Sequence, residues 1–217
     1  GLSLPLAHYI HFRAKRKMLI FGAVVIALWL GYLLRILGWR ILLGQEGVFN
    51  TLLMDVGLID KPLGFLLYSP FAVIVSQTHL AMPFAFIPIY AAIERLPKGV
   101  MQAASDLGAN GFKQVTTVEI PIIADGLTFG ALFAFVLAFG DYFAPALVGS
   151  PSTVAVGSVA GEQFGGALNW PLGAAIGVIM LVAVLLALVV PQMVKRLRML
   201  FIHLRDRRDD RLSEAGH

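Results

Sequence analysis

The sequence predicts an all-α, polytopic membrane protein. Of its 217 residues, 58% are hydrophobic and 14% are charged, whereas soluble globular domains average about 25% charged residues. The uncharged residues gather in runs long enough to cross a bilayer, which requires about 20 apolar residues for each helix. The basic residues lie between these runs and in the C-terminal tail. These observations favour a single membrane domain over residues 1–217, with about five spans if an incomplete first one is counted.

The first third of the chain predicts one half-span and one full span. Residues 1–12, GLSLPLAHYIHF, are too short to cross a bilayer and lack the flanks of a signal peptide. We therefore expect the inner half of a helix, N-terminally truncated. After a basic cluster at 13–17, residues 18–34 are uncharged and predict a complete span that ends at Arg35. Residues 38–68 mix polar and short apolar pieces, which predicts an external segment with one or two short helices.

Three further runs predict the remaining spans. Residues 69–93 contain three prolines, but membrane helices tolerate proline where neighbours satisfy the freed carbonyls, so one kinked span is expected. Residues 122–146 predict the next span. A stretch rich in Gly, Ser and Thr follows at 147–169, and residues 170–194 predict the last span before a basic tail at 195–217.

The distribution of lysine and arginine predicts the orientation. If the 13–17 cluster is cytoplasmic, alternation of the spans places 94–121 and the 195–217 tail on the cytoplasmic side as well. These segments contain all but three of the 17 basic residues. The three that fall on the opposite side are Arg35, Arg40 and Lys61. Because the positive charge then faces the anionic lipids of the cytoplasmic leaflet, the net charge of +4 requires no nucleic-acid partner.

The longest polar interval between two spans is 94–121. Apolar residues recur there at helical spacing, at Val100, Ala103, Ala104 and Leu107. Pro97 suits the first turn of a helix, Gly108 suits a left-handed helix end, and Pro121 opens the next span. We expect two small helices joined by a glycine turn. These residues alone leave two interpretations open, a knob that docks on a partner or an interfacial loop that covers the cytoplasmic end of the bundle.

The spacing within this interval resembles the EAA loop of ABC importer permeases, which reads Glu-Ala-Ala, three residues, Gly, nine residues and Ile-x-Leu-Pro. The matching positions here are Gln102, Ala103, Ala104, Gly108, Val118, Ile120 and Pro121. Gln102 replaces the glutamate of the pattern and removes its charge, so an ion pair of that glutamate with an ATPase is in question here. Val118 and Ile120 also depart from the pattern but stay apolar. Residues 94–121 are called the EAA-like loop below.

The flanking sequences resemble the spermidine/putrescine branch of these permeases, and the similarity covers nearly the whole chain. They are LWLGYLLRILGWRILLGQEGVFNTLL, IYAAIERLPKG, FGDYFAPALVGSP and NWPLGAA. The resemblance implies the type I ABC importer permease fold, with six spans in the intact chain. It also implies a multi-pass inner-membrane location, ABC ATPase subunits that contact the EAA-like loop, a second permease subunit and a periplasmic substrate-binding protein.

The implied mechanism is alternating access driven by ATP, with a small cationic solute such as spermidine or putrescine as the substrate. No G-x-x-x-x-G-K-[ST] motif occurs in the chain, so nothing here is built to cradle ATP phosphates. ATP is therefore expected on a separate subunit, and the chain is not expected to be an enzyme or to hold a cofactor. The coupling residues implied by the resemblance are Gln102, Ala103, Ala104, Gly108 and Pro121.

Asp141 is the sharpest candidate for a substrate pathway. It lies near the outer end of the 122–146 span and is followed by Tyr142 and Phe143. Carboxylates within spans usually face a cavity, and a carboxylate beside aromatic rings suits an ammonium ligand. The alternative is a carboxylate at headgroup level that is solvated or caps a neighbouring helix. Asp125, close to Pro121, is better explained as a charge at a helix N-terminus.

Two tryptophans are weaker candidates for the same pathway. Trp39 lies at the outer boundary, where tryptophans often anchor a protein to the interface, and Trp29 lies within a span where it faces either the cavity or lipid. His8 and His11 have the spacing of a metal-binding pair, but without a third ligand in the sequence nearby, packing or hydration at the membrane interface is the better explanation.

Two other classes compete with the ATP-driven importer. A secondary transporter or channel should carry charges deep in several spans, and the middles of these spans are uncharged. An intramembrane enzyme would require a nucleophile with a base or a metal constellation, and no such pattern occurs in the sequence. An ABC permease for another small organic solute is the nearest alternative.

Overall fold

The computed structural model describes residues 1–97 and 99–214, with side chains described up to Met193. The described residues contain helices and no strands. In chain order the helices are α1 (Ser3–Phe12), α2 (Lys17–Trp29), α3 (Tyr32–Leu43), α4 (Val48–Asp55), α5 (Pro70–Glu94), α6 (Val100–Asp106), α7 (Gly111–Gln114), the π-helix η1 (Val115–Glu119), α8 (Ile120–Ile122), α9 (Ala124–Phe139), α10 (Phe143–Val148), α11 (Val156–Gly165) and α12 (Trp170–Glu214). The predicted all-α class is confirmed.

Two helices of the described chain are long and apolar enough to cross a membrane by themselves, α5 and the Trp170–Met193 part of α12. They correspond to the runs predicted at 69–93 and 170–194. Two bent pairs bring the number to four if each pair is one span. In the first, α2 meets the segment Tyr32–Asp55 at 99°, and in the second, Gly111–Ile122 meets α9 at 79°.

In the regions predicted as spans at 18–34 and 122–146, the helices are shorter than the apolar runs: α2 ends at Trp29 and α9 ends at Phe139. The first breaks after Trp29, because Leu30 and Gly31 take extended backbone conformations before α3 begins. The second stops at Phe139, because Asp141 caps a new helix, α10, instead of continuing α9. Apolar composition alone does not indicate either break, since both depend on local backbone and capping geometry.

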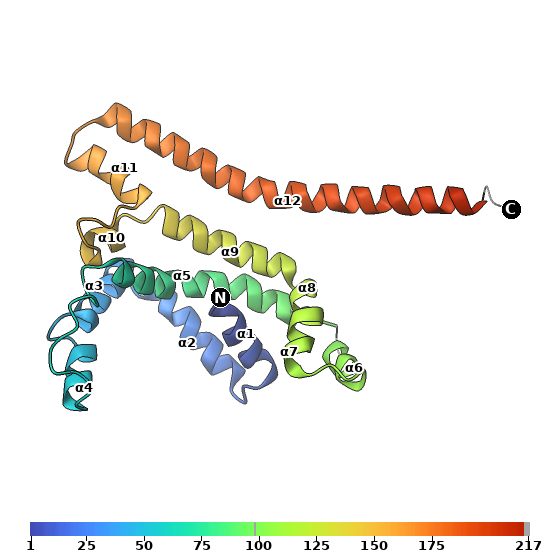
Figure 1. Ribbon diagram of the computed structural model, residues 1–217, viewed down its shortest axis with the longest axis horizontal. Helices are drawn as coiled ribbons and strands as arrows, with labels where there is room; N and C mark the ends of the chain where they lie inside the picture. Colours follow the sequence, from blue (N-terminus) through green and yellow to red (C-terminus); the bar gives the residue numbers. More distant parts are fainter. Residues whose placement is uncertain (98, 215–217) are drawn as a thin grey trace. The chain divides into compact units, whose positions relative to one another are not determined.

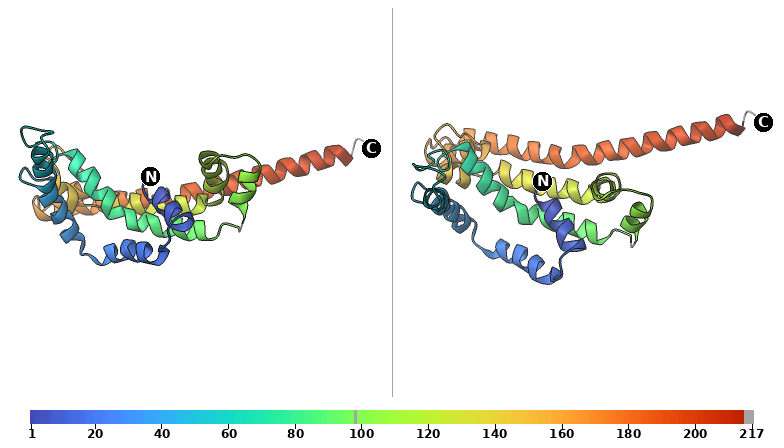
Figure 2. Two further views of the ribbon diagram at one scale, coloured as in Figure 1. Left: turned by 90° about the horizontal axis from the view of Figure 1, so that it is seen from below. Right: turned by 60° about the horizontal axis from the view of Figure 1, so that its bottom comes forward.

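Helix α5 is the central element of the fold. Ser69 caps its N-terminus by accepting a hydrogen bond from the Ala72 amide at 3.2 Å, and Pro70 occupies the first turn, where a missing N–H costs nothing. Figures 1 and 2 show α9 running beside α5, with α1 against the later half of α5. The 69–93 prediction of a single helix through three prolines is therefore confirmed.

Glycines allow α9 to approach α5 closely. A Cβ atom at Gly130 would lie 2.8 Å from the carbonyl oxygen of Ala85, and one at Gly126 would overlap Ala92. Both glycines are buried on the α5 side of α9, four residues apart on one helical face. Small residues at this spacing let the backbones of membrane helices come together and pack by van der Waals contact.

Two apolar clusters lie toward opposite ends of α5. One joins α3 and α10 to the first part of α5 through Ile36, Leu43, Leu66, Ala72, Val73, Leu80, Ala144 and Val148. The other joins α1 and Ile123, which lies two residues after the EAA-like loop, to the last part of α5. Its buried members are Ala7, Ile10, Phe86, Ile89, Tyr90, Ile93 and Ile123. The loop and the region around Asp141 are thus attached to opposite ends of the same helix (Figure 1).

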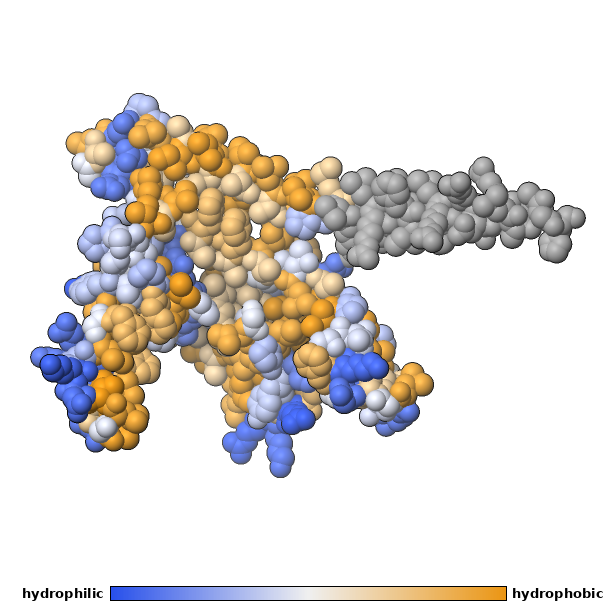
Figure 3. Space-filling model, viewed as in Figure 1, coloured by the Kyte–Doolittle hydropathy of each residue, from blue (hydrophilic) through white to orange (hydrophobic). Residues whose placement is uncertain are grey.

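The segment predicted as external, 38–68, contains the end of α3 and all of α4. Asn50 organises it, because its fully buried amide donates to the carbonyl of Gly44 at 2.9 Å and accepts from the amide of Leu63 at 2.8 Å. Figure 3 shows hydrophilic side chains at this end and at the α1–α2 turn, with apolar surface between them. That distribution fits helices whose middles face lipid.

Contacts group Gly1–Ala174 into one compact unit, and α12 from Ala175 onward forms a second. The first unit contains α1–α11 and every site described below. The second is a continuation of one apolar helix. The predicted basic tail at 195–217 falls in the part whose side chains are not described, and residues 215–217 lie outside the described chain. Its cytoplasmic location therefore stays a prediction.

Candidate functional site: the EAA-like loop and a polar pocket

The EAA-like loop folds as two short helices joined by a tight turn. Helix α6 starts after Gly99 (φ +86°), not at Pro97, because the left-handed glycine resets the chain direction before the first helical turn. Gly108 also has a positive φ (+82°), which a residue with a Cβ adopts only at a cost. Asn110 caps α7 by accepting from the Lys113 amide at 2.9 Å. The predicted glycine turn is confirmed. The one difference is that Pro97 precedes the helix and does not lie in its first turn.

Much of the loop's apolar face points away from the protein. Leu107 is 89% exposed and Phe112 is 80% exposed, while Ala104 packs inward at 9%. Gln102 and Ala103 are exposed as well. A large apolar side chain at such exposure gains nothing from its own fold, since burial of a Leu or Phe stabilises by about 1.5–3 kcal/mol. These residues together form an apolar knob without a partner in the described chain.

The loop joins the α9 span through unusual helical geometry. Residues Val115–Glu119 form a π-helix, a conformation that often marks functional sites. The Thr116 and Thr117 hydroxyls donate to backbone carbonyls of the preceding turn, at Phe112 and Lys113 respectively. Pro121 lies in the single turn α8, and the chain bends at Ile123 into α9. Asp125 lies in the first turn of α9, as predicted.

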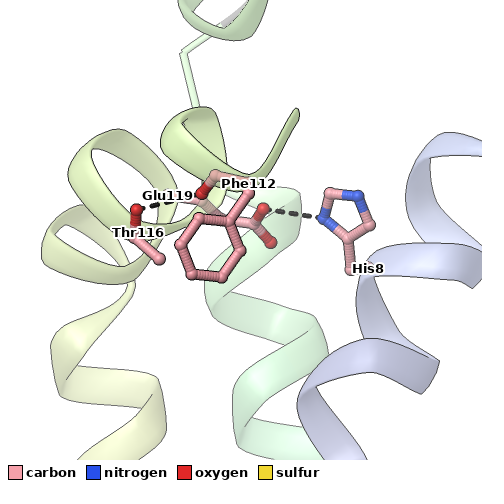
Figure 4. Close-up of polar contacts among 4 residues, drawn as sticks. All are labelled: His8, Phe112, Thr116 and Glu119. Carbon is pink, nitrogen blue, oxygen red and sulfur yellow. Dashed lines mark hydrogen bonds and ion pairs between the residues drawn. The ribbon is translucent and has the colours of Figure 1, made fainter. Parts of the chain in front are cut away.

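Glu119 leaves this segment on its inner side and contacts α1. Its carboxylate is fully buried, and one oxygen, Oε2, lies 2.7 Å from Nδ1 of His8. Figure 4 shows this contact together with Thr116 and Phe112 on the loop side. The second oxygen, Oε1, has no hydrogen-bond partner among the described residues. His8, which the sequence placed in a packing role, is therefore an ion-pair or hydrogen-bond partner of the loop.

A polar pocket lies at the other end of α5 and α9. Its volume is about 250 Å³, just below the range of about 300–1,000 Å³ that is usual for small-molecule sites. Its walls are mostly apolar and its polar groups come from three elements, as expected for a site that orients a small solute. The residues that line it are Leu28, Trp29, Leu30, Gly31, Tyr32, Arg35, Gln77, Leu80, Ala81, Phe84, Leu137, Ala138 and Asp141. We call it the Asp141 pocket.

Asp141 is 6% exposed and is held on both oxygens. Oδ1 accepts from the backbone amides of Phe143 at 2.9 Å and Ala144 at 3.2 Å, which caps α10. Oδ2 accepts from Nε2 of Gln77 at 3.0 Å. The two interpretations that the sequence left open are thus combined in one side chain, because the carboxylate both caps a neighbouring helix and lines a pocket.

The other predicted pathway residues are only partly brought together. Trp29 lines the Asp141 pocket although it is 87% exposed. Tyr142 and Phe143 follow Asp141 but do not line that pocket, and both are about two-fifths exposed. Trp39 lies elsewhere, packed on the apolar cluster at the first part of α5, with its indole N–H donating to Nδ1 of His79 at 3.1 Å. Of the five residues, Asp141 and Trp29 share the pocket.

Three pocket residues were missed as site candidates. Gln77 orients Asp141, and Tyr32 interacts with the same carboxylate. Arg35 is 9% exposed, and its Nε and Nη1 atoms find no partner in the described chain. From the sequence alone, Arg35 is interpreted only as the end of the span predicted at 18–34. A usable signal was the polar Gln77 inside a long uncharged run, since polar groups in spans tend to face a cavity.

The chain matches the family model described as "Binding-protein-dependent transport system inner membrane component" over residues 3–198. This covers most of the chain and both sites described above. The chain belongs to this family of inner-membrane transport components. The resemblance stated from the EAA-like spacing is thereby confirmed, and the chain is a multi-pass membrane protein and a membrane component of its system.

Curated members of this permease family are similar over most of the chain. The spermidine/putrescine transport system permease protein PotB of Haemophilus influenzae is 36% identical over 174 residues, which cover 79% of this chain and 60% of that protein. PotB of Escherichia coli K12 is 32% identical over 176 residues, covering 81% of this chain and 64% of that protein. The chain therefore spans less than two thirds of the length of these relatives.

Solved structures confirm the permease fold. A crystal structure of a bacterial ABC transporter involved in the import of the acidic polysaccharide alginate superposes with a TM-score of 0.70 at 19% identity, covering 88% of this chain and 71% of that one. A second, of a bacterial alginate ABC transporter in complex with a pentasaccharide-bound periplasmic protein, gives 0.69 at 19% identity, covering 85% and 69%. At this identity the likeness concerns the fold alone.

The described residues of this permease contain no group of three or more His, Cys, Asp or Glu side chains that could hold a metal ion. His8 and His11 accordingly have other surroundings. His8 contacts Glu119, and the ring of His11 packs edge-on against Phe12 at 4.6 Å between centroids.

Proposed function

We propose that this protein is the permease subunit of an ATP-driven importer and that the EAA-like loop is its contact with the ATPase. The observation that carries the proposal is the exposed apolar knob of the loop, with Leu107 and Phe112 presented on either side of the Gly108 turn. Aromatic side chains such as Phe112 are enriched in protein–protein interfaces, and exposed apolar patches mark interaction sites. The alternative interpretation, a loop covering the bundle's own end, would bury these side chains instead.

The proposed orientation places the loop, the 13–17 cluster and the basic tail in the cytoplasm. Arg13, Lys15, Arg16 and Lys17 are all exposed at the α1–α2 turn, where they can meet anionic headgroups. Arg95 and Lys113 add positive charge on the loop side. The C-terminus follows on the cytoplasmic side by alternation of the spans.

In this scheme the protein performs no bond chemistry. ATP binds and is hydrolysed on separate ABC ATPase subunits, and a periplasmic binding protein delivers the solute to the outer face. A second permease subunit, identical or paralogous, completes the pathway. The cycle of the ATPases drives alternating access through the loop, as a rigid-body change. Support for these partners comes from the family match and from the spermidine/putrescine transport systems of the PotB relatives.

The proposed substrate is a small organic cation such as spermidine or putrescine. Asp141 supplies a buried negative charge in the pocket, and Trp29, Tyr32 and Phe84 supply aromatic rings. An ammonium group is stabilised by both, through charge pairing and through cation–π contact. Trp39, Tyr142 and Phe143 belong to the same proposed pathway farther from the pocket. An ABC permease for another small organic solute is the second candidate. It is favoured by Arg35 in the same pocket, whose Nε and Nη1 atoms have no hydrogen-bond partner among the described residues.

The docking proposal is tested by the same substitution at two glycines with similar backbone geometry, one inside the EAA-like loop and one outside it. Gly108→Trp distorts the loop turn, and Gly57→Trp makes the same change at the other end of the protein. Both glycines have positive φ (+82° and +74°), and a Cβ atom added at either position would meet open space. We expect Gly108→Trp to abolish co-purification with the ATPase encoded alongside this protein, while Gly57→Trp leaves it intact. Deletion of 97–108 should have the same effect as Gly108→Trp, and a full complex with either loop variant contradicts the docking.

A further inference from the structure

The covalent route from the EAA-like loop into the membrane passes through a bend. The loop's last helical stretch and α9 meet at 79°, and Ile123 between them leaves regular helix geometry at φ −90°, ψ 10°. Residues at the ends of helices can act as hinges that absorb a change in φ and ψ, so a bend at Ile123 can take up part of a displacement of the loop. A second connection on the loop side of the bend would make transmission more direct.

Glu119 supplies such a connection on the loop side. It is the last residue of η1, two positions before Pro121, and its carboxylate is fully buried against α1. The bond from Oε2 to His8 Nδ1, at 2.7 Å, joins segments 111 residues apart in the chain. Because Oε1 has no hydrogen-bond partner in the described part of the chain, the contact with His8 is the main polar interaction that fixes the position of the carboxylate. A buried carboxylate that loses its partner is strongly disfavoured, so the two groups resist separation.

Helix α1 is otherwise attached to α5. The Ser3 hydroxyl donates to the carbonyl of Met82 at 3.1 Å, and Ala7 and Ile10 pack in the apolar cluster at the last part of α5, which also includes Ile123. The hydroxyls of Thr116 and Thr117, in contrast, bond only within their own segment. Within the described residues, the Glu119–His8 contact is thus the side-chain hydrogen bond that links the loop to α1.

We propose that His8 and Glu119 are positioning residues for transport, which make α1 move together with the EAA-like loop. Motion that the ATPase imposes on the loop then enters two membrane helices, α9 through the bend at Ile123 and α1 through this pair. This inference rests on the proposed function. It goes beyond that function by assigning a coupling route through two side chains that the EAA pattern does not include.

The test measures coupling, and assembly serves as its reference. The complete transporter, containing this permease with its ATPase, second permease and binding protein, is reconstituted in proteoliposomes with putrescine as the probe. The measured quantity is putrescine imported per ATP hydrolysed. We expect His8→Ala and Glu119→Gln to lower this ratio by about fivefold or more, the lower end of typical coupling effects, while co-purification with the ATPase is retained. Thr116→Val, whose hydroxyl bonds only within its own segment, is the matched control and should keep the wild-type ratio.

A rescue experiment separates coupling from a merely structural role. The 217 residues contain no cysteine, so cysteines introduced at positions 8 and 119 are the only thiols within this part of the subunit. Two long side chains span the native contact, so a short bifunctional thiol crosslinker is needed, since a disulfide requires Cβ atoms about 4 Å apart. The His8→Cys/Glu119→Cys variant should be poorly coupled before crosslinking and regain coupling afterwards.

The outcomes distinguish the two levels of the proposal. If the wild-type transporter hydrolyses ATP in response to its binding protein but imports no putrescine, the substrate part of the proposed function fails. If the wild type imports putrescine and the His8 and Glu119 variants keep its ratio, the positioning role is overturned. Loss of import after crosslinking would also overturn it, because it would mean that α1 and the loop must separate during the cycle.

Discussion

Substitution of Asp141 tests the Asp141 pocket most directly, because two available variants separate its structural role from its charge. Asn keeps an oxygen at the Oδ1 position and caps helices about as well as Asp, so Asp141→Asn should preserve the bonds to Phe143 and Ala144. It removes the negative charge proposed to attract an ammonium group. Asp141→Ala removes both the cap and the charge.

The magnitudes follow from the bonds that each variant loses. Loss of a helix cap costs about 0.5–2 kcal/mol, and loss of the charge-assisted bond from Gln77, at 3.0 Å, costs about 1.5–3 kcal/mol. Because Asp141→Ala loses both interactions, we expect it to lower the free energy of unfolding by about 2–5 kcal/mol. Asp141→Asn keeps a neutral acceptor or donor toward Gln77 and should lose about 1 kcal/mol. The unfolding midpoint of the purified protein in detergent should therefore fall in the order wild type, Asn, Ala.

The assay compares this stability order with uptake of putrescine by cells that contain the complete transporter. Asp141→Asn should assemble with the ATPase at wild-type levels and yet import at least tenfold less putrescine. If uptake by Asp141→Asn equals that of the wild type, the carboxylate serves only as a cap. If Asn destabilises as much as Ala, the hydrogen bonds seen at Oδ1 do not act as a cap, and the reasoning from geometry is wrong.

Two further predictions concern the scaffold. Gly130→Ala should destabilise the protein by about 1–3 kcal/mol through overpacking, since its Cβ would meet the Ala85 carbonyl oxygen at 2.8 Å. The control, Gly22→Ala, adds a Cβ in open space and should be neutral or slightly stabilising. Equal midpoints for both variants in thermal unfolding would contradict the close α5–α9 contact. Asn50→Ala leaves the carbonyl of Gly44 and the amide of Leu63 without their partner and should cost about 2–3 kcal/mol. Limited proteolysis should then cut the 44–63 segment faster in Asn50→Ala, and an unchanged cleavage rate would argue against this role.

Local features of the chain were predictable because their causes are local. The turn at Gly108 needed only a glycine after an apolar helical stripe, and the structure gives that glycine the expected positive φ. The helix over 69–93 needed only its apolar length and a Ser-Pro start. The prediction that Pro97 lies in the first turn of the helix was wrong. Gly99, two residues later, takes a left-handed conformation that no spacing rule indicates, and the helix begins only after it.

Features that depend on distant partners were not predictable. Glu119 and His8 are 111 positions apart, and neither has a neighbour in sequence that marks it as a partner of the other. Similarly, Gln77 and Asp141 are 64 positions apart, and only the antiparallel packing of α5 on α9 brings them together. For Asp141 itself the residue type and place were enough to raise both a cavity position and a capping role, but only the two backbone bonds and the pocket lining show that one carboxylate does both.

The placement of the small residues on α9 bears on how a displacement of the EAA-like loop can reach the pocket. The closest contact with α5 is made at Gly126 and Gly130, near the loop end of a helix that starts at Ala124 and ends at Phe139. At 1.5 Å of rise for each residue, the midpoint of this contact lies about 6 Å from the loop end of α9 and about 16 Å from its pocket end. If α9 pivots at the glycines, a displacement at the loop is therefore enlarged about threefold at the pocket. Gln77 on α5 and Asp141 at the end of α9 would then be pulled apart first, because their single bond lies where the lever moves farthest. The same geometry gives α1, tied to the loop on the near side of the bend, a smaller displacement than the pocket end of α9.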